Sequence, residues 1–211
     1  MLNNEQMRSE KNSEQLILEA AEAEFLEKGY RNAVTTAIAR RAGVTHAMLH
    51  YYFRTKENLF QKVFQHKVQL VGDSFYQNLN ENLSFEGAIR KFVESHFDFL
   101  RQNPKLLNFV YNEVVINKEN RNILLDQVRP KLLVVINQID KLLSEELSKG
   151  KIRPIEASDL LINIVSMNVM TFILCPIIEG LGNARNPEYL ENFIAERREN
   201  NVQFVLNALK L

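Results

Sequence analysis

The segment from residue 35 to residue 60, TTAIARRAGVTHAMLHYYFRTKENLF, constrains the fold of this chain more than any other. Its pattern predicts two short helices joined by a glycine turn, followed by the start of a third helix. Gly43 stands where the chain leaves the first helix through a left-handed residue, a conformation that costs glycine almost nothing. We expect Thr35, Thr45 and Thr55 to cap the three helices, because a threonine hydroxyl can accept a hydrogen bond from a free amide of the first turn.

Two short capped helices around a glycine predict a helix-turn-helix unit, whose second helix enters the DNA major groove. Here the second helix is expected from residue 46 to residue 52, with Leu49 turned inward. The inward face of the first helix is formed by Ile38, Ala39 and Ala42. The side chains expected to point outward from the second helix are those of His46, Ala47, Met48, His50 and Tyr51.

Basic residues are concentrated around this unit. Between residues 28 and 67 the chain has eight lysines and arginines and a single acid, Glu57, although the whole chain has 26 residues of each sign. A local excess of positive charge is the footprint expected for a phosphate backbone, and a solvated basic face without a partner is the alternative. The preceding helix is expected from Asn12 or Ser13 to Gly29. Its outer, solvated face is expected to carry the acids Glu19, Glu22, Glu24 and Glu27.

The segment resembles the DNA-binding domain of the TetR family of bacterial transcriptional regulators. In that family a first helix has the pattern AA…F…G(Y/F), which is matched here by Ala20, Ala21, Phe25, Gly29 and Tyr30. The following pattern, IA…AGV(S/T)…L…(H/Y)F…(S/T)KE.L, is matched by Ile38, Ala39, Ala42, Gly43, Val44, Thr45, Leu49, Tyr52, Phe53, Thr55, Lys56, Glu57 and Leu59. The match covers about the first third of the chain.

This resemblance implies two sets of DNA-binding residues. The set for positioning on phosphates is Thr35, Thr36, Thr45, Tyr52 and Lys56. The set for base or groove contacts is His46, Ala47, Met48, His50 and Tyr51. His50 replaces the tyrosine that is usual in the family, and the charge of a histidine varies with pH. For Tyr52, a ring packed between helices is the alternative.

The rest of the chain also has helical periodicity. Helices are expected at residues 56–80, 84–103, 105–117, 119–150, 156–180 and 187–210. Asn186 is expected to cap the last of these, and Pro130 must either kink or break its helix. The predicted fold is therefore all-α: a three-helix helix-turn-helix DNA-binding domain at residues 1–55, joined to a larger helical regulatory, ligand-binding and dimerisation domain at residues 56–211.

The segment from Leu160 to Ile178 has no charged residue. A membrane span is the alternative that its apolar composition raises, but polar residues lie at scattered angles around this helix and no basic flank marks a topology. A helix that is apolar nearly all round is more simply buried between its own domain and a second subunit. We therefore expect a homodimer through helices 156–180 and 187–210, which the family resemblance also implies.

Aromatic and methionine side chains are frequent in the regulatory region and predict an apolar cavity with a few polar groups, with ordinary core packing as the alternative. The residues expected to bind an effector are His96, Phe97, Leu100, Phe109, Asn112, Met167, Met170 and Phe172.

The sequence has no glycine-rich phosphate loop, no clustered histidines and one cysteine, Cys175, so we expect no enzyme activity, cofactor, metal site or internal disulfide. Its N-terminus does not resemble a signal peptide, which predicts a cytoplasmic protein. We expect a ligand-responsive transcriptional repressor that binds a (pseudo)palindromic double-stranded DNA operator as a homodimer and responds to a small-molecule effector. The alternative is a helical protein–protein adaptor or small-molecule-binding protein without a DNA function.

Overall fold

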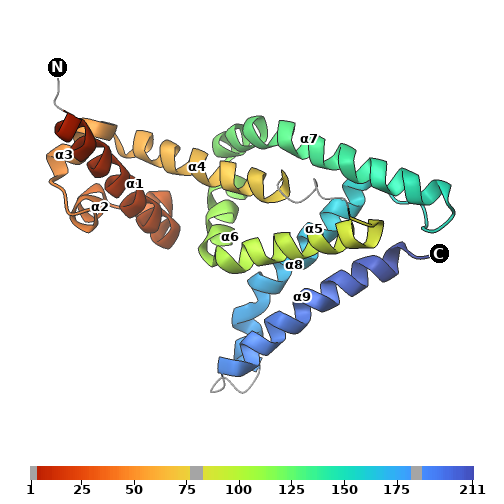
Figure 1. Cartoon of the computed structure of the whole chain (residues 1–211). Coiled ribbons are helices and arrows are strands. Elements are labelled where there is room, and N and C mark those ends of the chain that lie inside the picture. Colours follow the sequence, from red (N-terminus) through yellow and green to blue (C-terminus); the bar gives the residue numbers. More distant parts are fainter. Residues whose placement is uncertain (1–3, 77–82, 182–186) are drawn as a thin grey trace. The chain divides into compact units, whose positions relative to one another are not determined.

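The structure is a computed structural model that describes residues 4–76, 83–181 and 187–211. These residues are helical almost throughout, and an isolated bridge joins Ile152 to Lys210. The predicted all-α fold is confirmed. In chain order the helices are α1 (Asn4–Asn32), α2 (Thr35–Arg41), α3 (His46–Phe53), α4 (Lys56–Tyr76), α5 (Phe85–Gln102), α6 (Pro104–Val110), the π-helix η1 (Tyr111–Ile116), α7 (Lys118–Ser148), α8 (Ala157–Leu181) and α9 (Pro187–Leu209) (Figure 1).

The chain forms two compact units. The first comprises Met1–Leu70 with Asn108–Leu125, and the second comprises Val71–Leu107 with Asp126–Leu211. The first unit therefore extends beyond the helix-turn-helix into α4 and includes η1 and the start of α7. The predicted division into residues 1–55 and 56–211 describes roles rather than compactness, and it stays a prediction.

Several helix ends differ from the predicted ones. Helix α1 begins at Asn4, earlier than predicted, because residues 4–11 include glutamate, glutamine, methionine, arginine and lysine, which are good helix formers. It breaks at Gly29 (φ 71°, ψ 168°), where its end was predicted. Pro130 lies inside the continuous helix α7 and does not break it. The predicted helix at 105–117 is divided into α6 and the π-helical turn η1. The predicted cap Asn186 and the predicted end of α4 at residue 80 lie outside the described residues.

An aromatic cluster forms the centre of the first unit. The Phe25 ring packs edge-on against Phe60, with 5.2 Å between ring centroids, and Phe60 stacks on Phe64 at 5.8 Å. Phe109 of α6 lies 6.0 Å from both Phe60 and Phe64. Burying several large rings stabilises this unit strongly and fixes α1, α4 and α6 relative to one another.

In the second unit, α5, α8 and α9 lie side by side (Figure 1). Ser84 caps α5 by accepting a hydrogen bond from the Gly87 amide at 3.2 Å. One face of α5 is buried, and its residues are Ile89, Phe92, Val93, His96, Phe97 and Leu100. Ile89, Phe92 and Val93 belong to a core that also includes Val135, Ile139, Ile164, Val202 and Val205.

One helix among the described residues, Ala157–Gly180 within α8, is long and apolar enough to span a membrane by length and composition. A helix in the core of a soluble protein can satisfy the same criteria. Its buried side includes Asn168, which is wholly buried, and Thr171. Asn168 hydrogen-bonds to α5 and α9, so this side faces protein. The exposed apolar residues of α8 are Ile162, Met170, Ile173, Leu174 and Ile177.

Candidate nucleic-acid interface

The helix-turn-helix forms around a small apolar core. Ile38 and Leu49 are wholly buried, and Ala39 and Ala42 are nearly so. Gly43 has φ +69°, the left-handed conformation that was predicted for the turn, and its amide donates to the Arg40 carbonyl at 3.2 Å. The buried alanines let α2 pack closely against its neighbours, so α3 is held on a rigid support.

Two of the three predicted caps are confirmed. The Thr45 hydroxyl accepts from the Met48 amide at 3.2 Å, and the Thr55 hydroxyl accepts from the Asn58 amide at 3.1 Å. The prediction that Thr35 caps α2 is wrong. The extended residue Val34 occupies the cap position, and Thr35 is the first helical residue. Because its hydroxyl is not needed as a cap, it reaches across to α3.

The outward orientation predicted for α3 is confirmed. The exposed side chains are those of His46, Ala47, Met48, His50 and Tyr51. Tyr51 is 72% exposed, although it carries a large aromatic ring. Tyr52 is half-buried, and its ring lies 5.3 Å from Tyr51 and 6.4 Å from Phe53. Contact of these residues with DNA stays a prediction.

A chain of hydrogen bonds fixes the two histidines of α3. His50 donates from Nδ1 to the Arg54 carbonyl at 2.9 Å, since a carbonyl can only accept. His50 Nε2 lies 3.2 Å from His46 Nε2, which is also 3.0 Å from the Thr35 hydroxyl. This pair was not predicted, although the spacing of four residues places both rings on one helix face.

The acids of α1 neutralise part of the basic segment. Glu24 pairs with Lys28 at 2.6 Å, Glu27 with Arg41 at 3.1 Å, and Glu22 with Lys67 at 2.5 Å. The prediction that these acids form a solvated outer face holds for Glu19 and Glu27, which are exposed. It is wrong for Glu24, and Glu22 is half-buried beside Lys67 of α4. Glu24 is only 3% exposed. Within the described part of the chain, the cations of the segment that form no ion pair are Arg31, Arg40, Arg54, Lys56 and Lys62.

Lys56 begins α4 and is held by the end of α1. Its ammonium lies 4.8 Å from the centroid of the Tyr30 ring and donates to the Arg31 carbonyl at 3.3 Å. A cation over an aromatic face and a hydrogen bond together restrict a long, flexible side chain. Lys56 is half-buried, with its charge at the first turn of α4.

The residues predicted to bind an effector fall into separate groups. Phe97 packs on Phe172 at 4.9 Å between ring centroids. Met167 and Met170 line an apolar groove of about 400 Å³ between α8 and α9, together with Arg197. His96 and Leu100 are buried in α5. Phe109 and Asn112 belong to the first unit, where they line a different pocket. Their role in binding stays a prediction.

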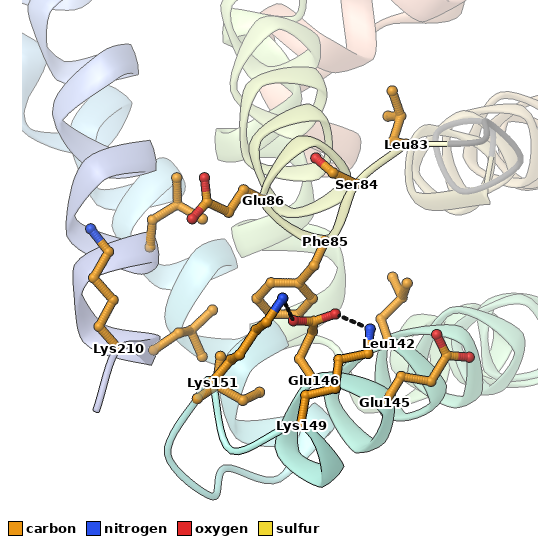
Figure 2. Close-up of a pocket in the computed structure, with 13 residues that line it drawn as sticks. Leu83, Ser84, Phe85, Glu86, Leu142, Glu145, Glu146, Lys149, Lys151 and Lys210 are labelled. Carbon is orange, nitrogen blue, oxygen red and sulfur yellow. Dashed lines mark hydrogen bonds and ion pairs between the residues drawn. The ribbon is translucent and has the colours of Figure 1, made fainter.

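A further pocket of about 470 Å³ lies in the second unit, between the start of α5, the end of α7 and the end of α9. Figure 2 shows the Glu146 carboxylate between Lys149 and Lys151, at 2.5 Å and 3.8 Å from their ammonium nitrogens. The hydrogen bond between Glu146 and Lys149 lowers the pKa of the carboxyl and raises the pKa of the ammonium. The acidic and basic side chains that line this pocket largely compensate one another in charge. The pocket was not predicted from the sequence.

Comparison with known proteins places this geometry in context. Residues 17–63 match the family model described as "Bacterial regulatory proteins, tetR family". The chain is 23% identical over 137 residues to the fatty acid metabolism regulator protein of Bacillus subtilis, covering 65% of this chain and 69% of that protein. It is 22% identical to the regulator RutR of Escherichia coli, over 92% of this chain and 89% of that protein. The crystal structure of a TetR transcriptional regulator from Chloroflexus aurantiacus has the same fold, with a TM-score of 0.68, 17% identity and coverage of 97% and 99%.

Proposed function

Because the chain belongs to the TetR family of bacterial transcriptional regulators, and is therefore a DNA-binding regulator, we propose that it is a cytoplasmic repressor that releases its operator when it binds a small-molecule effector. The observation that carries the proposal is the uncovered outer face of α3. The exposed side chains from His46 to Tyr51 stand on a rigid helix-turn-helix, with exposed cations nearby in the same unit.

The two sets of side chains have different roles in this proposal. Thr35, Thr36, Thr45, Tyr52 and Lys56 position the protein on phosphates, which carries no sequence information. The exposed residues of α3 read the major groove: Met48 and Ala47 can meet thymine methyl groups, and His46 or Tyr51 can hydrogen-bond to base edges. The histidine chain supports this division, since it presents the His46 and His50 rings in a defined orientation.

We propose that two copies associate through α8 and α9. The exposed apolar side chains of these helices support this assembly, among them Ile162 at 62%, Ile177 at 57% and Phe204 at 66% exposed. Exposed apolar surface is typical of protein–protein interfaces, which supports this assembly. A dimer supplies two recognition helices, which can bind two half-sites of a (pseudo)palindrome and combine their affinities.

The effector site is proposed within the helices of the second unit. The groove between α8 and α9 supports it, because an apolar lining with one cation, Arg197, suits a small molecule with an apolar body and an anionic group. An effector that prefers the conformation with wrongly spaced recognition helices weakens DNA binding, and DNA weakens effector binding by the same factor. A coupling of about 1–3 kcal/mol is typical.

A mobility-shift assay on the DNA upstream of the protein's own gene tests this function. Lys56→Ala should weaken binding to every duplex about equally and lower the salt slope by about one, because it removes one phosphate contact. Met48→Ala should instead change which sequences are preferred. Lys141→Ala, which removes an exposed lysine from α7, serves as the control and should bind like wild type. Absence of any salt-dependent, sequence-selective shift would favour the adaptor function instead.

A further inference from the structure

Helix η1 contains a buried carboxylate, Glu113, which lies outside the helix-turn-helix. Six residues of π-helix are rare and concentrate at functional sites. Glu113 in this turn is only 7% exposed. Its Oε1 accepts from the Tyr30 amide at 3.0 Å, and its Oε2 lies 3.5 Å from Asn120 Nδ2. A carboxylate is expensive to bury unless it is hydrogen-bonded, so the bond to Tyr30 defines how this segment packs against α1.

The amide that Glu113 binds belongs to a break in α1. Gly29 has φ +71°, and at this break the Tyr30 N–H is directed to Glu113, 83 residues further along the chain. A Cβ at position 29 would lie 3.7 Å from the Glu113 carboxylate, which is ordinary van der Waals contact, so the acid lies directly against this backbone. Glu113 therefore fixes the backbone at the point where α1 changes direction.

The same break holds Lys56. The Tyr30 ring packs on Phe60 at 4.8 Å between centroids, and the Lys56 ammonium lies at the same distance from the ring centroid. The neighbouring Arg31 carbonyl accepts from Lys56 at 3.3 Å. Both groups that restrict Lys56 thus lie within one residue of the amide that Glu113 fixes.

We propose that Glu113 is a positioning residue for DNA binding, which acts through Tyr30 to hold the Lys56 ammonium ready for a backbone phosphate. The inference rests on the proposed phosphate contact of Lys56. Restricting a lysine in advance reduces the conformational entropy that it loses on binding. Without the Glu113 acceptor, the Tyr30 amide is left unsatisfied, the break relaxes, and Lys56 loses its aromatic and carbonyl partners.

A double-mutant cycle measured by fluorescence anisotropy tests this inference. The probe is a labelled duplex of about 30 base pairs from the DNA upstream of the gene, long enough for two half-sites one turn apart. Glu113→Ala should weaken binding about fivefold, the effect of losing one hydrogen bond, and should lower the salt slope. Glu113→Gln keeps an acceptor oxygen and should restore most of the affinity. Asn120→Ala removes the other partner of Glu113 and should leave binding unchanged.

The decisive comparison is made in the Lys56→Ala background. There Glu113→Ala should have no further effect, because the side chain through which it acts is absent. An equal loss in both backgrounds would overturn the inference, as would unchanged binding of Glu113→Ala where Lys56→Ala is weakened. If Lys56→Ala itself binds like wild type, the proposed phosphate contact fails instead. Should Glu113→Ala not fold, Glu113→Asp replaces it, since its shorter side chain cannot reach Tyr30.

Discussion

Acidification from pH 7 to pH 5 should destabilise the folded chain through His96. The geometry around this ring assigns its protonation. Asn168 Nδ2 donates to the Val93 carbonyl at 2.9 Å and lies 3.1 Å from His96 Nδ1, while its Oδ1 accepts from Asn201 at 2.9 Å. Because the amide nitrogen can only donate, His96 Nδ1 is an acceptor and the ring is neutral. A protonated ring would oppose one N–H to another in a buried site.

The expected loss of stability follows from the pKa. Burial lowers the pKa of His96 from 6.5 to about 4. In the unfolded chain the pKa of His96 keeps its ordinary value of 6.5. Between the unfolded and the folded pKa the unfolded state therefore binds more protons, and the free energy of unfolding falls as the pH falls. At about 1.36 kcal/mol per pKa unit, the loss is about 2 kcal/mol at pH 5 and approaches about 3 kcal/mol below pH 4.

Urea unfolding at pH 7 and at pH 5, at one protein concentration, measures this difference. His96→Gln replaces the ring with an amide that can still accept from Asn168 but does not titrate, so it should remove most of the difference. His66→Gln is the matched control, because His66 is an exposed histidine on α4. If His96→Gln loses as much stability between the two pH values as wild type does, the assignment of His96 is refuted.

Substitutions at four positions should have effects set by local geometry. Gly43→Ala should destabilise by about 1 kcal/mol in a thermal melt, because φ is +69° while a Cβ there meets nothing within 4 Å. Gly150→Ala, at φ +63° with equally open space, should cost a similar amount but leave DNA binding intact; a loss of DNA binding in both would contradict a local role for Gly43. Leu49→Ala removes a wholly buried side chain and should destabilise by about 3 kcal/mol in urea unfolding, and a loss below about 1 kcal/mol would show that the site collapses freely. Arg198→Ala removes a bidentate ion pair with Asp98, at 2.8 and 2.7 Å, and a hydrogen bond to Glu94 at 2.9 Å. Because the Arg198 side chain is 33% exposed, the free energy of unfolding should fall by only about 1 kcal/mol. Arg198→Lys should recover little of this loss, since lysine cannot form the bidentate pair.

Features that depend on neighbouring residues were predictable from the sequence. The turn at Gly43, the caps at Thr45 and Thr55, and the buried stripe of α5 all follow from spacing along a helix. The outward face of α3 follows from the same periodicity. The predicted cap at Thr35 is wrong because the extended residue Val34 occupies the cap position and Thr35 is already helical; the sequence pattern does not distinguish the two positions.

Features that depend on residues far apart in the chain were not predictable. The pairing of Glu22 with Lys67 joins α1 to α4, and the bond from Glu113 to Tyr30 spans 83 residues. The acids of α1 have ordinary helical spacing, which predicts a solvated face unless the packing is known. The effector-binding residues were predicted from their side-chain types, and side-chain type alone does not determine which helices pack together. Phe109 accordingly belongs to the aromatic core of the first unit.

The ion pairs of α1 with the basic segment affect how the protein divides between specific and non-specific DNA. Three of the eight cations between residues 28 and 67 are neutralised within the fold. With fewer free cations, the protein releases fewer counterions from the DNA phosphates and binds non-specific DNA more weakly. A DNA-binding regulator that binds non-specific DNA more weakly has more copies available for its specific sites.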